Sequence, residues 1–172
     1  MRLSIIVALA ENNAIGLGNR LLYHLPADMR RFKQLTTGHT VLMGSNTFRS
    51  LPKGALPNRL NVVLSRKGTS EDFPNCLHFK DLSAALDSLN ALATSGNEQA
   101  QEVFVIGGAQ VYHAALPLVH RLCLTQIHDT PPEADTFFPP INPNEWRETF
   151  RERHEADEKH AVPFTFIDLE RK

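Results

Sequence analysis

Short apolar runs that resemble buried strands alternate with helical patterns along most of this chain. The runs are rich in β-branched and aliphatic residues and lack the polar alternation of a half-exposed strand. They cover Leu3–Ala10, Thr40–Gly44, Leu60–Ser65, Val103–Ile106 and Arg121–His128. Strands of this kind are typical of parallel sheets that helices cover on both faces. The alternation therefore predicts an α/β fold of three layers with a mostly parallel central sheet.

Three helices are expected between these runs. Pro26–Thr36 and Leu82–Ala93 carry apolar residues at helical spacing, and Asp81 is placed to cap the second helix. A third helix begins near Ala109, after two glycines, and ends before Pro117. In sheets of this architecture the ligand crevice lies outside the carboxyl ends of the strands, so functional residues are sought there.

The pattern changes after Trp146, where two strand-like segments flank a polar connection. We interpret them as an antiparallel hairpin at the edge of the sheet. No repeat, low-complexity tract or long linker interrupts the 172 residues, and 42% of them are hydrophobic. The sequence thus predicts one domain over residues 1–172, with a single main core.

Charge and cysteine content exclude several classes of protein. A net charge of −1 argues against a nucleic-acid or membrane surface, because these partners favour a basic excess. Cys76 and Cys123 each fall inside an apolar, strand-like run, which favours reduced core cysteines over a disulfide. The apolar run at the N-terminus is short for a signal peptide, and no run approaches the length of a membrane span. We expect a cytoplasmic protein.

Three strand exits share a composition suited to an anionic ligand. "VFVIGGAQVY" places two glycines between a strand and a helix, "TVLMGSNTF" places Gly44 there, and "NVVLSRKG" ends with Ser65 and Arg66. Taken alone, the Gly-Gly pair is more typical of a tight turn, because it does not match G-x-G-x-x-G. Glycine, hydroxyls and a guanidinium at neighbouring exits together favour an elongated ligand with phosphates, such as a nucleotide cofactor.

Asp28 is the candidate functional acid. It falls at the third position of the first predicted helix, where a carboxylate is stabilised by the helix dipole, and this role alone would explain it. It also shares a helix face with the apolar Phe32 and Leu35. A carboxylate on an apolar face beside a nucleotide crevice is a candidate acid or substrate anchor. The preceding loop, "ENNAIGLGNRLLYHLP", contains two glycines and suits a segment that closes over a site.

No metal site is expected. The histidines of "HEADEKH", His154 and His160, are six residues apart, which is not the spacing of H-E-x-x-H. We interpret them as solvent-exposed members of a charge-balanced polar stretch.

Several of these motifs resemble the dihydrofolate reductase family, in the family's order and over nearly the whole chain. The matching segments are "AIGLGNRLLYHLPADMRRFK", "VLMGSNTF", "LPNRLNVVLSR", "VFVIGGAQVY", "LCLTQI" and "ADTFFP", and they are most similar to the bacterial chromosomal type. The resemblance implies the reduction of 7,8-dihydrofolate by hydride transfer from NADPH, in a monomer.

The resemblance also implies roles for individual residues. Asp28 would anchor the pterin, with Thr125 supporting that contact and with Tyr23 and Leu21 beside it in the catalytic site. Arg59 would receive the α-carboxylate of the glutamate tail. The pocket would be walled by Ile6, Ala8, Met29, Phe32, Leu51, Leu56 and Ile106.

On the cofactor side, the resemblance implies a cis peptide between the two glycines and a 2′-phosphate held by Ser65 and Arg66. Contacts with NADPH are expected from Ala8, Ile15, Gly16, Asn19, Leu21, Gly44, Ser45, Thr47, Leu64, Ser65, Arg66, Ile106, Gly107, Gly108, Ala109, Gln110, Val111 and Tyr112.

Two residues depart from the family pattern. Tyr23 stands where the family usually has tryptophan, and Ser45 stands where many relatives have a basic residue. Two alternatives remain: a pyrimidine reductase of riboflavin synthesis, which would lack the Asp28 helix, and a nucleotide-binding relative without catalysis.

Overall fold

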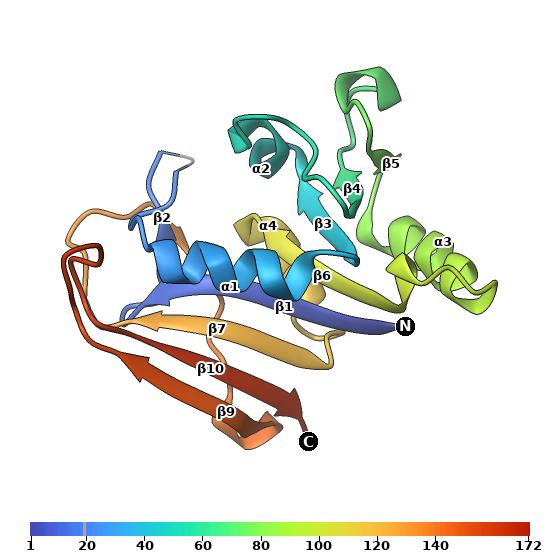
Figure 1. Ribbon diagram of the computed structural model, residues 1–172. Coiled ribbons are helices and arrows are strands. Elements are labelled where there is room, and N and C mark those ends of the chain that lie inside the picture. The colour runs from blue at the N-terminus through green and yellow to red at the C-terminus, as the bar shows by residue number, and fades with distance from the viewer. Residues whose placement is uncertain (19) are drawn as a thin grey trace.

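An eight-stranded sheet forms the centre of the structure, a computed structural model that describes residues 1–18 and 20–172 (Figure 1). Its strands follow the order β5-β4-β3-β6-β1-β7-β10-β9. Neighbours from β5 to β7 pair in parallel, and β10 pairs antiparallel with both β7 and β9. The strands are β1 (Arg2–Ala10), β3 (Thr40–Gly44), β4 (Leu60–Leu64), β5 (Leu77–Phe79), β6 (Glu102–Gly107), β7 (Arg121–Ile127), β9 (Trp146–His154) and β10 (Phe164–Arg171).

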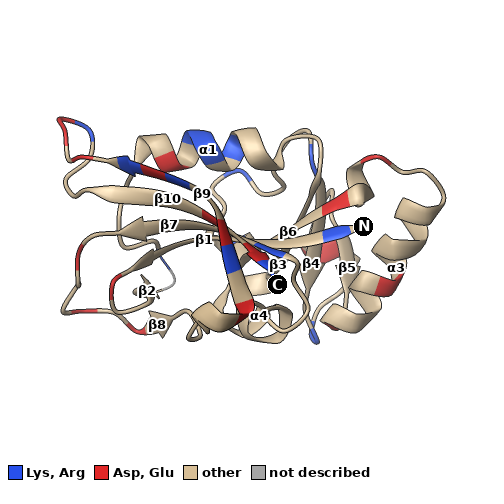
Figure 2. Cartoon of the chain, turned by 90° about the horizontal axis from the view of Figure 1, so that it is seen from below, with Lys and Arg blue, Asp and Glu red and all other residues tan. Residues whose placement is uncertain are grey.

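Helices lie on both faces of this sheet, and Figure 2 shows α1 on one side and α4 on the other. The α-helices are α1 (Pro26–Thr36), α2 (Ser45–Ser50), α3 (Leu82–Thr94) and α4 (Ala109–Ala115). Short 3₁₀ turns occur at η1 (Ser70–Asp72), η2 (Gln99–Gln101) and η3 (Pro143–Glu145). A second, two-stranded sheet pairs β2 (Ala14–Gly16) with β8 (Thr136–Phe137).

The core is divided by the sheet into separate apolar clusters. Leu89 of α3 and Tyr112 of α4 pack with Leu42 of β3 on one face. On the other face, Leu25 before α1 packs with Phe164 and Phe166 of β10. A third cluster combines Val41, Met43, Val63 and Phe73 with Phe48, Leu51, Leu56 and Ile106 around it. Adjacent residues of β3 thus enter different clusters, as the alternation of side chains along a strand requires.

The architecture expected from the sequence is confirmed. Each predicted apolar run is a strand with bounds within one residue of those expected, and α1 has the predicted bounds. Asp81 caps α3 by accepting the N–H of Ala84 at 2.8 Å. The helix start expected after Gly44 is that of the six-residue α2. The sequence did not predict the short β2, β5 and β8, because elements of this length carry too few residues to show a period.

The prediction for Cys76 is wrong in one respect. Cys123 is buried in β7, but Cys76 lies in a turn just before β5 rather than inside a strand. The turn follows η1, and Asn75 has a φ of 62°, which is incompatible with a continuous strand. Both cysteines are free, as expected.

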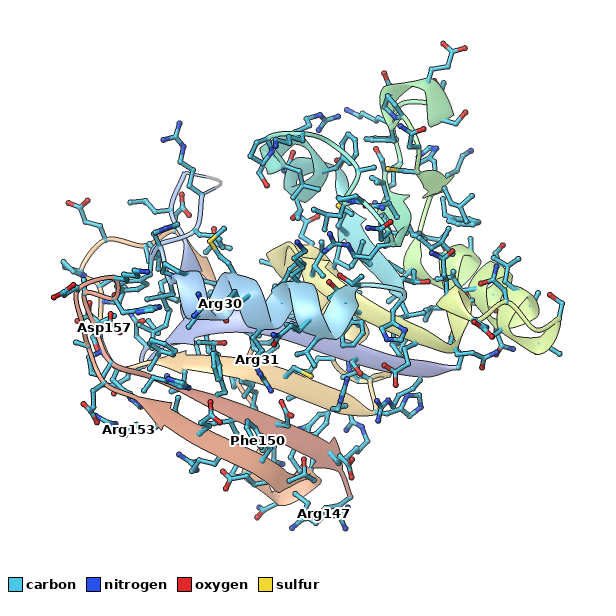
Figure 3. The ribbon with its side chains drawn as sticks, viewed as in Figure 1. Arg30, Arg31, Arg147, Phe150, Arg153 and Asp157 are labelled. Carbon is cyan, nitrogen blue, oxygen red and sulfur yellow. The ribbon has the colours of Figure 1, made fainter. Side chains whose placement is uncertain are left out.

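Charged side chains cover the edge strand β9, whose residues after Trp146 are exposed up to Arg153. Arg147 pairs with Glu170 at 3.0 Å and Arg153 with Glu155 at 2.7 Å. Figure 3 shows the side chains of this region. Such pairs add little stability, but charges on an edge strand disfavour pairing with another sheet. Among the described residues, no helix is long and apolar enough to cross a membrane.

Candidate active site

Asp28 and Thr125 form the polar centre of the site. Pro26 occupies the first position of α1 and Asp28 the third, in the first turn, where the helix dipole favours a carboxylate. Thr125, from the middle of β7, is 3% exposed and donates its hydroxyl to Asp28 Oδ1 at 2.5 Å. Burial raises the pKa of Asp28, and the Thr125 hydrogen bond opposes that rise. The fold thus holds a carboxylate in an apolar setting with one oxygen already bonded.

Arg31 contributes a positive charge near Asp28, one helical turn along α1. Its charge lowers the pKa of Asp28 and so partly offsets burial. The guanidinium bonds Asp168 of β10 at 2.7 Å and lies 4.7 Å from the ring centre of Phe166. Figure 3 shows Arg31 directed from α1 toward β10. The ion pair and the aromatic contact tie the helix to the sheet beside the acid.

The first turn of α1 is held by His160, which the sequence interpretation placed wrongly in solvent. His160 is 6% exposed, and its Nε2 accepts the N–H of Ala27 at 3.0 Å. Its Nδ1 lies 2.8 Å from Asp157 Oδ1. A backbone N–H donates only to a lone pair, so Nε2 is unprotonated here and Nδ1 carries the proton toward Asp157. His160 therefore replaces a side-chain cap, since Leu25 at the N-cap position provides none.

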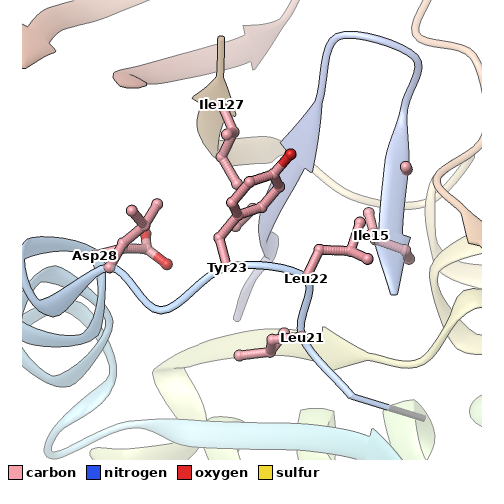
Figure 4. A pocket seen from close by; sticks show the side chains of 9 residues that line it. Ile15, Leu21, Leu22, Tyr23, Asp28 and Ile127 are labelled. Atoms are coloured by element: carbon pink, nitrogen blue, oxygen red, sulfur yellow. The ribbon is translucent and has the colours of Figure 1, made fainter. Parts of the chain in front are cut away.

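A pocket opens beside Asp28, between the end of β1, the end of β7 and the segment that enters α1 (Figure 4). Its lining is mostly apolar. The residues are Ala8, Ala14, Ile15, Leu21, Leu22, Tyr23, Leu25, Asp28 and Ile127. Tyr23 donates its hydroxyl to Asp129 Oδ2 at 2.5 Å. The pocket thus brings Asp28, Tyr23 and Leu21 together, although Leu21 is 79% exposed.

The remaining apolar residues predicted to contact the substrate come from other elements and are not among those that line this pocket. Ile106, Leu51 and Leu56 pack at the rim of the third apolar cluster. Ile6 and Phe32 are half-buried, while Met29 is 55% exposed. An exposed apolar side chain next to a pocket provides surface that a bound molecule would cover.

Arg59 is held in place by neighbours on two sides. Its Nη1 donates to Thr36 Oγ1 at 3.1 Å and its Nε to the carbonyl of Pro57 at 2.9 Å. Partial burial lowers its pKa, but a guanidinium stays charged at any physiological pH. The side chain is therefore a fixed cation near the end of α1.

The glycine-rich exits of β6 and β3 lie side by side, as expected. The Gly107–Gly108 peptide is cis, which confirms the sequence-based expectation. A Cβ atom on Gly107 would lie 3.1 Å from Thr47 Oγ1, and one on Gly44 would lie 3.3 Å from Val111 Cγ2. Gly107 also has a φ of 137°, where side chains are strained. These close approaches pack the two exits against each other at the starts of α2 and α4.

The exit of β4 follows beside β3, because Leu64 pairs with Gly44. Ser65 donates its hydroxyl to the carbonyl of Lys67, and Arg66 is exposed. Ala109, Gln110 and Tyr112 belong to α4 on the β6 side, and Tyr112 donates its hydroxyl to the carbonyl of Ile6 at 2.9 Å. The three exits thus form a continuous row along the carboxyl edge of the sheet.

Comparison with known proteins identifies the family. A family model described as "Dihydrofolate reductase" matches residues 2–171. The chain belongs to the dihydrofolate reductase family. It is 40% identical to dihydrofolate reductase type 3 of Salmonella typhimurium over 172 residues, covering 100% of this chain and 99% of that protein. It is 38% identical to the dihydrofolate reductase of Neisseria gonorrhoeae, covering 97% of this chain and 96% of that one.

A solved structure agrees with this assignment. Dihydrofolate reductase from Enterococcus faecalis, complexed with NADP(H) and RAB-propyl, superposes with a TM-score of 0.84 at 28% identity. The alignment covers 99% of this chain and 96% of that chain. The α/β fold predicted from the sequence is therefore that of a dihydrofolate reductase.

The loop after β1 is tied to the rest of the structure by Asp135. The Asp135 carboxylate accepts the N–H of Gly18 at 2.9 Å, and its own N–H donates to the carbonyl of Gly16 at 3.1 Å. Ile15 and Gly16 belong to β2 in this loop. Asn19, also expected to contact the cofactor, lies outside the described residues. The paired backbone holds the start of the loop in place.

Sequence reasoning did not find several residues that shape the site. Asp129 and Asp135 receive hydrogen bonds from the loop, and His160 caps α1. Asp135 lies in the segment "ADTFFP", whose resemblance to the family is a signal for it, but nothing in the sequence pairs Asp129 with Tyr23. Among residues 1–18 and 20–172, no group of three His, Cys, Asp or Glu side chains is placed to hold a metal.

Proposed function

We propose that this protein reduces 7,8-dihydrofolate to 5,6,7,8-tetrahydrofolate with NADPH as the hydride donor. The observation that carries the proposal is the hydrogen-bonded Asp28–Thr125 pair beside an apolar pocket. Membership of the dihydrofolate reductase family and similarity to a structure complexed with NADP(H) support it.

Asp28 anchors and orients the pterin. One carboxylate oxygen is bonded by Thr125, and the ionised carboxylate has further lone pairs for a ring N–H and the adjacent amino group. Two parallel donors on one carboxylate fix the plane of the ring as well as its position. Tyr23 and Leu21 complete this side of the pocket.

The rest of the substrate is held by residues along α1 and beyond it. Met29 and Phe32 supply apolar surface on the helix, and Ile106, Leu51 and Leu56 supply it from the opposite cluster. Arg59, fixed by Thr36, pairs with the α-carboxylate of the glutamate tail. We assign Ile6 and Ala8 of β1 to the same pocket.

The row of strand exits fits NADPH. The glycine backbone at Gly107–Gly108 and Gly44 leaves room that a Cβ would fill, and Thr47 Oγ1 lies beside it. We assign the pyrophosphate to these groups with Ala109, Gln110, Val111 and Tyr112, and the 2′-phosphate to Ser65 and Arg66. We assign Ser45, Leu64 and Ile106 to the same row, and Ala8, Ile15, Gly16, Asn19 and Leu21 to contacts with the nicotinamide end. When bound, NADPH supplies the hydride.

The protein's own contribution is alignment and exclusion of water. Asp28 holds one ring in a fixed orientation, and the loop between β1 and α1 closes the pocket over it. Aligning the reactants removes much of the entropic cost of the reaction. Burial raises the pKa of Asp28, whereas the Thr125 hydrogen bond and the charge of Arg31 lower it and so favour the ionised form.

The enzyme acts as a single-domain, cytoplasmic monomer without a nucleic-acid partner. A single sheet contains strands from both ends of residues 1–172, which supports one domain. The charged edge strand β9 disfavours association through the sheet, and the net charge of −1 disfavours polyanions.

Loss of NADPH absorbance on addition of dihydrofolate tests the proposal directly. Turnover is expected for the wild-type protein. Asp28→Asn keeps the shape of the side chain and is expected to bind folate-like ligands but to lose hydride-transfer rate, most severely at neutral pH. Measured kcat/KM against pH for both proteins decides the role of Asp28. An Asn variant as active as wild type would exclude that role.

Oxidation of NADPH with a ribosylated aminopyrimidine, and none with dihydrofolate, would instead favour the pyrimidine reductase alternative. Failure to oxidise NADPH with either substrate would favour a nucleotide-binding relative without catalysis.

A further inference from the structure

The segment from Leu21 to Leu25 forms one wall of the pocket and is held mainly by contacts of Tyr23 and Leu25. It leads from the loop after β1 into α1 and has no regular secondary structure. Leu25 is 3% exposed and anchors one end in an apolar cluster, whereas Leu21 at the other end is 79% exposed. Tyr23, in the middle, makes a side-chain hydrogen bond to Asp129. The position of this wall therefore depends on how firmly Tyr23 is held.

Asp129 is a well-placed anchor for Tyr23, because its backbone is itself bonded to the sheet. It lies two residues after the end of β7. Its carbonyl accepts the N–H of Glu11, just after β1, at 3.0 Å, and its N–H donates to the carbonyl of Ile127 at 2.9 Å. Asp129 thus joins the ends of two adjacent central strands, and its half-buried carboxylate receives the Tyr23 hydroxyl at 2.5 Å.

The Tyr23 hydroxyl remains a donor across the whole working range of pH. Burial, together with the hydrogen bond and charge of Asp129, raises the pKa of Tyr23 to about 12. The phenol is therefore neutral at physiological pH, and a hydrogen bond from a neutral donor to a carboxylate is of the stronger kind. Tryptophan, which the family usually has here, offers an indole N–H in a different place, so Tyr23 and Asp129 form a matched pair.

We propose that Asp129 is a positioning residue for the reaction: by holding the Tyr23 hydroxyl, it fixes the wall formed by residues 21–25 against the pocket that contains Asp28. Tyr23 and Asp28 both line that pocket, so a displaced ring changes the space next to the acid. Leu21, at the exposed end of the wall, moves with it. The pair acts on the alignment of the bound molecules and not on their charge.

This inference rests on the proposed function, because the rate that it concerns is that of hydride transfer to dihydrofolate. Failure of the proposed function would appear as absence of turnover in the wild-type protein. Failure of the inference would appear as wild-type behaviour in the variants. Limited proteolysis needs no turnover, so the two outcomes are separable.

Three variants isolate the hydrogen bond. Tyr23→Phe removes the hydroxyl and keeps the ring, Asp129→Ala removes the acceptor, and Asp129→Asn keeps an acceptor oxygen without the charge. Asp87→Ala, which removes a carboxylate on α3, far from the pocket in sequence and in the fold, is the matched control. Tyr23→Phe keeps every packing atom of the ring, so it tests the proposal even if Asp129→Ala fails to fold.

Single-turnover hydride transfer is the kinetic readout. We expect Tyr23→Phe and Asp129→Ala to slow it about tenfold, because misplacement of reacting groups is costly even from a distance. The Kd of NADPH should change less than about twofold, and Asp129→Asn should recover most of the rate. The double variant should be no slower than either single variant, since both remove one interaction. Unchanged rates in Tyr23→Phe, or additive losses in the double variant, would overturn the proposal.

Limited trypsin digestion gives the readout that is independent of turnover. Arg20 is exposed and lies three residues before Tyr23, so cleavage after Arg20 reports opening of the wall. The fragment ending at Arg20 should form about five to ten times faster in Tyr23→Phe and Asp129→Ala than in the wild-type protein or Asp87→Ala, because cleavage follows the population of the open form. Equal cleavage rates in all four proteins would show that the hydrogen bond does not hold the wall.

Discussion

Replacing Thr125 by valine tests how much the Thr125 hydrogen bond favours the ionised form of Asp28. Valine matches the shape of threonine but removes the hydroxyl that bonds Asp28 Oδ1 at 2.5 Å. Thr125 is 3% exposed, so water does not easily replace the lost donor. A hydrogen bond to a charged group contributes about 1.5–3 kcal/mol. Because about 1.4 kcal/mol corresponds to a factor of ten, the ratio of ionised to protonated Asp28 at a given pH should fall at least tenfold.

The pKa of Asp28 should therefore rise further in this variant, adding to the effect of burial. In the proposed role of Asp28, substrate binding requires the ionised carboxylate, so the acid limb of kcat/KM against pH should move to higher pH, with the plateau above it less affected. The free energy of unfolding should also depend on the ionisation of Asp28. Because the pKa of Asp28 is raised in the folded protein, ionisation of Asp28 lowers the free energy of unfolding as pH rises above its unfolded value. The variant should lose about 1.5–3 kcal/mol near neutral pH and less in acid, where Asp28 is protonated.

Thr165→Val is the matched control for this experiment. Thr165 lies on the neighbouring strand β10 and is 1% exposed, but its hydroxyl is 2.7 Å from His128 Nε2 rather than beside Asp28. It should lower stability without moving the acid limb. The pH profile of steady-state turnover and denaturant unfolding at two pH values measure both effects. An acid limb that stays in place in Thr125→Val, or moves equally in Thr165→Val, would refute the reasoning.

Three further predictions concern the cofactor, the start of α1 and the core. Arg66→Ala should weaken binding of NADPH about tenfold and of NADH less than about twofold, whereas Lys67→Ala should leave the ratio unchanged; equal losses of both cofactors would contradict the assignment. His160→Ala should lower the free energy of unfolding by about 1–3 kcal/mol in denaturant titrations, since the Ala27 N–H loses its buried acceptor; an unchanged midpoint would show that the cap is dispensable. Leu89→Ala, at a fully buried position of α3, should cost about 2–5 kcal/mol in the same assay.

The carboxyl ends of parallel strands explain why much of the site could be predicted. Residues at the carboxyl ends of β3, β4 and β6 must meet at one edge of the sheet. Gly44, Ser65 and Gly107 could therefore be grouped from strand order and composition alone. Resemblance to a family then supplied roles that spacing alone left open, above all for Asp28 and Thr125.

Contacts between distant segments were beyond the reach of the sequence. His160 was placed in solvent because its neighbours are polar, yet the hairpin between β9 and β10 folds it against the start of α1. Burial of a polar side chain depends on a partner that satisfies it, and this partner, the N–H of Ala27, lies 133 residues away. The local sequence around Ala27 or around His160 does not predict the contact between them.

The sequence by itself determined the order of the main strands and helices, the bounds of α1 and the position of Asp28 on it, because hydrophobic period and capping act over a few residues. Only the tertiary structure decided what surrounds that acid. Thr125, Arg31 and burial set the balance of its ionisation, and Asp129 holds the wall beside it through Tyr23. These effects depend on distances of a few ångströms between segments far apart in the chain, and such distances exist only once the sheet has brought the segments together.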